Sequence, residues 1–200
     1  MKKLWIFFMT VGIIALASCE KTDDLMDAQT QDEHELVSSS LYSLKNAPSQ
    51  PGNKGGITQF RAHMTGDQEV VEEPVITNAT GQARFQLSRD GTGLQFRLIV
   101  ANIQNVTMAH IHLGAPGVNG PVVVWLYPEG PPAALLPGST SGILATGVIT
   151  HENLVGPLAG QSLEDLVDLL RTGETYVNVH TQQYPAGEIR GQIVLTGPGH

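Results

Sequence analysis

Three stretches in the middle of the chain alternate strictly between apolar and polar residues. They are Phe60–Met64, Ala83–Leu87 and Leu94–Val100. A period of two residues is that of a β-strand with one buried face, so the pattern predicts a strand at each stretch. Asp90 and Gly91 stand between the second and the third stretch, and this pair predicts a tight hairpin there.

Four further stretches predict strands by their apolar content. Val122–Tyr127 is a continuous apolar run, which is typical of a strand covered on both faces. Gly142–Thr150 is another candidate, and Thr175–Thr181 and Glu188–Thr196 form a last pair. The pattern as a whole predicts roughly seven to nine strands, a number that suits a β-sandwich.

One helix is predicted before the final strand pair. Apolar residues follow Ser162 at helical spacing, namely Leu163, Leu166, Val167, Leu169 and Leu170. Asp165 stands three residues after Ser162, as in a capping box, and Gly173 is placed to end the helix. The fold class expected from the sequence is therefore all-β, with one short inserted helix.

The N-terminus has the architecture of a secretory signal. Lys2 and Lys3 precede the apolar stretch Leu4–Ala15, and the tetrapeptide Leu-Ala-Ser-Cys ends at Cys19. The tetrapeptide resembles the lipobox of bacterial lipoproteins, in which the cysteine becomes the lipidated first residue. Cys19 is the chain's one cysteine, and lipidation accounts for it. We therefore expect 1–19 to be a lipoprotein signal peptide and the acyl chains to anchor the protein in a membrane.

Composition separates a tether from a domain. Residues 20–56 are polar and acidic and lack apolar periodicity, so we expect a flexible tether there and a folded domain over 57–197. The net charge is −8, and without Lys2 and Lys3 nine basic residues face 19 acidic ones. This balance disfavours nucleic acid and anionic lipid surfaces as partners, because both attract Lys and Arg, and no nucleic-acid partner is expected.

Three histidines are candidate metal ligands. His110 and His112 lie two residues apart, so on a strand both side chains point to one face, roughly 6.5–7 Å apart along the backbone. His180 lies in the later strand "YVNVHT". Three neutral imidazoles suit copper or zinc. The alternative is that these are polar residues on the wet face of ordinary strands.

Polar neighbours extend the candidate site. Asn178 shares a strand face with His180, and Glu188 and Arg190 lie on one face of the next strand. Asn178 or Glu188 is a candidate to hold a histidine ring nitrogen. The simplest alternative for Glu188 and Arg190 is an ion pair with each other. His151 is a weaker candidate for a fourth ligand, and the Gly-rich segment 114–120 is interpreted as turn chemistry.

Four blocks of sequence carry a family resemblance. They read "FRAHMTGDQEV", "ATGQARFQL", "AHIHLGAPGVNGPVVVWL" and "ETYVNVHTQQYPAGEIRGQI". In order and spacing they resemble the CHRD domain, which is named after chordin and also occurs in bacterial exported proteins. The match runs from about Thr58 to Leu195. It implies an immunoglobulin-like β-sandwich, distantly similar to copper/zinc superoxide dismutase, and it implies no settled activity.

The resemblance strengthens the candidate site, because the family pattern includes the three histidines together with Glu188 and Arg190. A dismutase-like bimetallic centre is not expected, since His151 is the one histidine between His112 and His180. We expect an exported lipoprotein, anchored in the bacterial cell envelope at the outer membrane or the cell surface.

Three functions stay open at this point. The domain is expected to bind an extracytoplasmic protein or a small ligand. The alternative is a mononuclear copper or zinc site at the three histidines. A third possibility is that the polar cluster is a hydrogen-bonded network that fixes two strands. The metal site of the second possibility is either structural or redox-active, so the sequence favours a binding protein over an enzyme without deciding between them.

Overall fold

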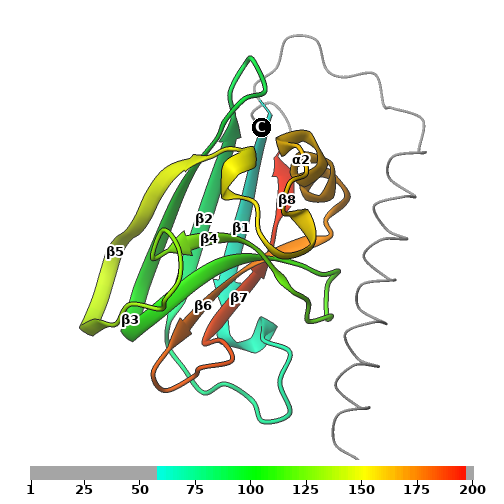
Figure 1. Ribbon diagram of the computed structural model, residues 1–200. Coiled ribbons are helices and arrows are strands. Elements are labelled where there is room, and N and C mark those ends of the chain that lie inside the picture. Colours follow the sequence, from blue (N-terminus) through cyan, green and yellow to red (C-terminus); the bar gives the residue numbers. More distant parts are fainter. Residues whose placement is uncertain (1–57, 197–200) are drawn as a thin grey trace, which may run out of the picture. The chain divides into compact units, whose positions relative to one another are not determined.

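The structure, a computed structural model, describes residues 58–196 (Figure 1). The expected signal peptide 1–19 with its lipidation site, Cys19, and the expected tether 20–56 lie outside the described residues. Within 58–196, no helix is long and apolar enough to cross a membrane.

Eight antiparallel strands and one α-helix make up the described fold. The strands are β1 (Gln59–Thr65), β2 (Thr80–Leu87), β3 (Leu94–Leu113), β4 (Val122–Tyr127), β5 (Leu136–Ile149), β6 (Thr175–Thr181), β7 (Ile189–Gln192) and β8 (Val194–Thr196). The helical segments are the short 3₁₀ turns η1 (Gly66–Gln68), η2 (His151–Asn153) and η3 (Gly156–Leu158) and the helix α2 (Leu163–Thr172). The expected all-β class with one short inserted helix is confirmed.

The long strand β3 organises the sheet. Its first part pairs with β2 and β5, and its second part pairs with β4 and β6. The pairings β1–β2, β2–β3, β3–β6, β6–β7 and β7–β1 close a ring. Because one strand serves both halves of the ring, the sheet bends into a barrel-like sandwich around a single core (Figure 1).

The alternating stretches place their apolar residues inside, as predicted. In β1, Phe60, Ala62 and Met64 are at most 2% exposed, while the residues between them face solvent. Phe60 pairs across the sheet with Phe85, and Ala62 with Ala83. Such cross-strand pairs lie on the same face, so these contacts fix the register of the two strands.

The predicted hairpin joins β2 to β3. Gly91 has φ +72°, a left-handed conformation that a glycine adopts at little cost. The Asp90 carboxylate accepts hydrogen bonds from the Ser88 hydroxyl at 2.6 Å and from the Thr92 backbone N–H at 3.1 Å. These bonds close the turn at the predicted place.

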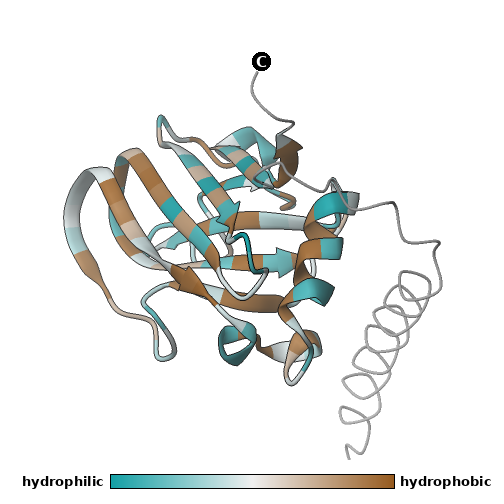
Figure 2. Cartoon of the chain, turned by 90° about the horizontal axis from the view of Figure 1, so that it is seen from above, coloured by the Kyte–Doolittle hydropathy of each residue, from teal (hydrophilic) through white to brown (hydrophobic). Residues whose placement is uncertain are grey.

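The predicted helix forms with both of its predicted ends. The Ser162 hydroxyl accepts a hydrogen bond from the Asp165 backbone N–H, the Asp165 side chain accepts one from the Ser162 N–H, and Gly173 ends the helix at φ +76°. The apolar stripe of α2 is buried. Figure 2 shows the polar side of the helix turned outward, and Figure 1 shows α2 beside β8.

Two predicted strands have different bounds in the structure. The candidate Gly142–Thr150 is the second half of β5, which already begins at Leu136 because bulges in the β3–β5 ladder absorb residues that break the alternation. The candidate Glu188–Thr196 is interrupted at Ile193, where the chain leaves β6 and pairs with β1 as β8. A change of pairing partner leaves no trace in the hydrophobic pattern.

Candidate metal centre

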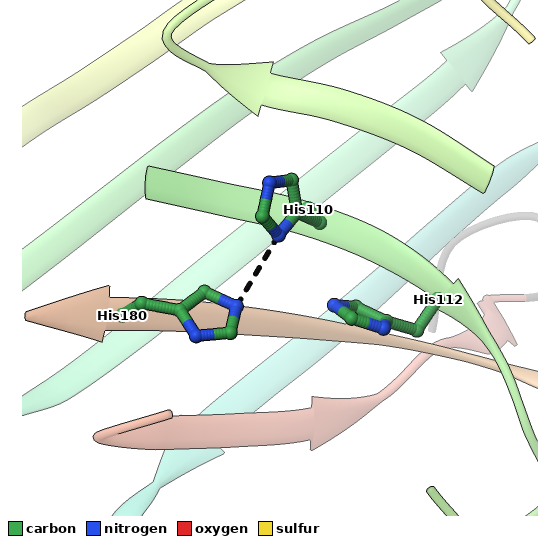
Figure 3. A group of neighbouring side chains, drawn as sticks. All are labelled: His110, His112 and His180. Carbon is green, nitrogen blue, oxygen red and sulfur yellow. Dashed lines mark hydrogen bonds between the residues drawn. The ribbon is translucent and has the colours of Figure 1, made fainter. Parts of the chain in front are cut away.

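The fold brings the three candidate histidines to one point. The β3–β6 ladder pairs His110 with Asn178 and Met108 with His180, so His110, His112 and His180 share a face (Figure 3). His110 Nδ1 lies 3.2 Å from His180 Nε2. One ring nitrogen from each of the three residues lies within 4.8 Å of the other two.

These histidines are buried, which excludes the wet-face interpretation. The exposed fractions are 2% for His110, 9% for His112 and 6% for His180. A buried polar group is costly unless it has partners, so three neighbouring buried imidazoles need a specific explanation.

Backbone carbonyls orient two of the rings. His112 Nδ1 donates to the Gly120 carbonyl at 2.8 Å, and His180 Nδ1 donates to the Pro185 carbonyl at 2.9 Å. A carbonyl can only accept, so in each ring the proton is on Nδ1 and Nε2 carries the lone pair. The expectation that Asn178 or Glu188 would hold a ring nitrogen is thus replaced by these two carbonyls.

Two ring nitrogens are buried without a hydrogen-bond partner in the described part of the chain. They are His110 Nε2 and His112 Nε2. The lone pair of His180 Nε2 accepts from His110 Nδ1, which leaves His110 Nε2 as a bare acceptor. Unpartnered buried acceptor nitrogens on neighbouring histidines are the donor groups that a metal site requires.

Aromatic side chains flank the rings. The Trp125 ring stands edge-on to His110, with centroids 4.3 Å apart, and Tyr176 stacks on His112 at 4.9 Å and an interplanar angle of 10°. The Tyr176 ring in turn carries the Arg190 guanidinium at 3.5 Å from its centroid. This packing limits how far the imidazoles can turn.

Burial keeps the imidazoles neutral. It lowers the pKa of His110 to about 3, helped by the neighbouring His180 and His112. It also lowers the pKa of His112 to about 4, against the hydrogen bond to Gly120, and lowers that of His180. At neutral pH the lone pairs are therefore free of protons, as metal binding requires.

Arg190 and Glu188 do not pair with each other as the sequence suggested. Arg190 donates to the Asn119 side-chain oxygen at 2.8 Å and to the Val118 carbonyl at 2.7 Å. Glu188 accepts from the hydroxyls of Thr77 and Thr181, at 2.6 and 2.7 Å. The two side chains therefore bond to different parts of the molecule: Arg190 to the segment 114–120, and Glu188 to Thr77 and to Thr181 at the end of β6.

The segment 114–120, interpreted as a plain turn, is a structural part of the site. Its Gly120 carbonyl orients His112, and its Gly120 N–H donates to the Tyr176 hydroxyl at 3.2 Å. Gln192 donates to the Gly114 carbonyl at 2.8 Å. Together with Arg190, these bonds hold the segment over the histidine face of the sheet.

Glu69 is the residue that the sequence interpretation missed. Asn178 donates to both of its carboxylate oxygens at 3.0 Å. Burial raises the pKa of Glu69 to about 7, although Arg190 and the Asn178 bond act in the opposite direction. Glu69 follows η1 and shows no periodicity; the one signal was its place inside the block "FRAHMTGDQEV".

The remaining histidines of the described residues lie elsewhere. His63 faces solvent on β1, and His151 begins η2 as an exposed residue. Neither belongs to the group formed by His110, His112 and His180. His151 is therefore not placed to be a fourth ligand.

Fold and site together define a class: an antiparallel β-domain with one short helix and with three buried, neighbouring histidines that loops cover. Within this class the chain is identified by the family model of the CHRD domain, which matches residues 60–193. The chain therefore belongs to the CHRD domain family. Among curated proteins and solved structures, none matches it.

Proposed function

We propose that this CHRD domain binds a single copper or zinc ion through His110, His112 and His180. The observation that carries the proposal is the cluster itself: one ring nitrogen from each of these three buried histidines lies within 4.8 Å of the other two, and His110 Nε2 and His112 Nε2 are buried without a hydrogen-bond partner in the described part of the chain. Imidazole nitrogen is a preferred ligand of both metals. This favours a metal ion over a protein or small-molecule ligand as the occupant.

A purely structural hydrogen-bond network does not account for all the ring nitrogens of the three histidines. The hydrogen bonds of the three rings satisfy four of the six ring nitrogens, His110 Nδ1, His112 Nδ1, His180 Nδ1 and His180 Nε2, and leave the two acceptors His110 Nε2 and His112 Nε2 unsatisfied. Each unsatisfied buried acceptor costs about 1–3 kcal/mol. Leucine or valine at these positions would avoid that cost, so stability alone does not explain the imidazoles.

Metal analysis of tag-free protein tests the proposal. We expect one copper or zinc ion per chain after loading and desalting, and loss of that ion in the double variant His110→Ala, His180→Ala. The matched control replaces His63 and His151, which lie outside the centre, and keeps the ion. The proposal fails if the double variant retains the wild-type metal content, or if the wild type never takes up metal.

We also propose that the domain works in the cell envelope as a lipoprotein anchored through Cys19. The support is the basic start, the short apolar core and the Leu-Ala-Ser-Cys sequence. Labelled palmitate should enter the wild type and not Cys19→Ser, and the wild type should fractionate with membranes. Equal labelling of both proteins would contradict the anchor without touching the metal proposal.

A further inference from the structure

We propose that the charge environment of the histidine centre selects monovalent copper, Cu(I), over the divalent ions Cu(II) and Zn(II). The inference rests on the proposed metal-binding function and names its ligand. Three features of the structure carry it: the neutral ligand set, the charges around it, and the packing that encloses it.

The ligand set supplies no negative charge. In the described part of the chain, the group around the candidate centre consists of His110, His112 and His180, with no thiolate or carboxylate. A divalent ion held by three neutral imidazoles keeps its full charge of two, whereas Cu(I) keeps one. Because the cost of burying an ion grows with the square of its charge, the divalent ions are penalised far more.

A fixed positive charge lies beside the ligand set, one aromatic ring away from His112. The Arg190 guanidinium lies on the Tyr176 ring, which stacks on His112, and its charge opposes a positive charge on that imidazole. The acidic side chains of the surrounding network form their hydrogen bonds with groups other than the histidines: Glu69 with Asn178, and Glu188 with Thr77 and Thr181.

The packing also disfavours a fourth ligand. Zinc sites are almost always four-coordinate, with water completing the set where the protein gives three ligands. Here each of the three histidines is less than a tenth exposed, and the rings of Trp125 and Tyr176 stand against His110 and His112. Cu(I) is a softer ion that is stable with three nitrogen donors and does not require that water.

Competition titrations on the tag-free full chain test the selection. Under anaerobic conditions, bicinchoninate competes for Cu(I), and pyridylazoresorcinol competes for Zn(II) and, in air, for Cu(II). We expect the dissociation constant for Cu(I) to lie at least about 100-fold below those for both divalent ions. Equal or tighter binding of Zn(II) or Cu(II) overturns the selection and leaves the metal site standing. Binding of no metal overturns both.

A matched pair of variants isolates the charge. Trp125→Gln and Trp125→Glu remove the same ring beside His110 and differ in one negative charge. We expect Trp125→Gln to keep the preference for Cu(I) within about threefold, and Trp125→Glu to lower it by about 10-fold or more through attraction of the divalent ions. An identical preference in the two variants contradicts the charge argument. The wild-type titration decides the proposal even if both variants fold poorly.

Discussion

The two halves of β3 have the same alternating sequence pattern, but they differ in the burial of the polar residues. In the first half, Leu94–Val100, the polar residues Gln95 and Arg97 alternate with the apolar ones and face solvent. In the second half the alternation continues through His110 and His112, yet every residue from 109 to 113 is buried.

The two halves of β3 differ in whether other segments of the chain cover their polar face. The polar face of the second half lies beneath segment 114–120, which is held down by Arg190, Tyr176 and Gln192, and beside the turn that carries Pro185. Alternation tells which residues share a face, and it does not tell whether that face meets water. A polar face that is roofed by ordered loops becomes an interior polar layer, where hydrogen bonds and charges act strongly.

The largest effect is expected from removing the guanidinium that anchors the cover. Arg190→Met keeps the packing of the stem but leaves the Val118 carbonyl and the Asn119 side chain without their donor. We expect a loss of about 3–5 kcal/mol in the free energy of unfolding, measured by urea denaturation.

Arg97→Met, on the uncovered half of β3, is the matched control. Its side chain is exposed, so the change should stay within about 0.5 kcal/mol. Similar losses in the two variants would show that the cover contributes no special stability and would remove the distinction between the two halves.

A smaller effect is expected at a glycine beside the buried network. Gly187 has φ +138°, and a Cβ there would meet Asn178 Nδ2 and the Glu69 carboxylate. Gly117 has φ +78°, and a Cβ added there would meet nothing within 4 Å. Gly117→Ala should therefore cost about 1 kcal/mol from backbone strain alone, and Gly187→Ala about 2–3 kcal/mol, because it also breaks the Asn178–Glu69 contact.

Thermal and urea unfolding of the two glycine variants measures this difference. The Gly187→Ala variant should also change the pH dependence of stability, since Glu69 loses its partner, whereas Gly117→Ala should not. If both alanine variants lose the same free energy of unfolding, backbone strain accounts for both losses, and the close packing at Gly187 contributes nothing.

The sequence predicts what depends on local pattern. Strand positions in β1, β2 and β6, the hairpin at Asp90 and both ends of α2 follow from alternation, turn residues and caps, and the structure confirms them. His110, His112 and His180 come together because β3 pairs with β6. The alternating pattern alone does not determine this pairing; the family resemblance suggests it.

What the sequence could not predict depends on loops that fold back. Gly120 and Pro185 contribute backbone carbonyls, and any residue type presents a carbonyl, so no side-chain signal marks them. Glu69 reaches Asn178 from a segment without periodicity. The expected Glu188–Arg190 ion pair does not form, because Arg190 bonds to the segment 114–120 and Glu188 to Thr77 and Thr181, which are distant in the sequence or on another strand.

The smallest expected effect is the change in stability with pH at Glu69, and it tests where the covered polar face of the sheet ends. The pKa of Glu69 is about 7 in the folded protein, above the ordinary 4.5, so folding favours its neutral form. That contribution to stability is fully present below about pH 4.5 and is lost as the pH rises through 7. Glu69→Gln does not titrate, so relative to the wild type its stability should rise by roughly 1–2 kcal/mol from pH 4.5 to 8, the half-buried carboxyl being partly screened.

Urea unfolding of the metal-free proteins at pH 4.5 and pH 8 measures that change. Glu72, three residues further along and exposed, supplies the matched variant Glu72→Gln, which should stay parallel to the wild type at both pH values. If the free energy of unfolding of Glu69→Gln also changes with pH as that of the wild type does, Glu69 lies in water, outside the region that covers the histidine face. A divergence at Glu69 alone would put the edge of the buried polar layer between these two residues, since an ionised carboxylate is penalised only where the cover keeps water away.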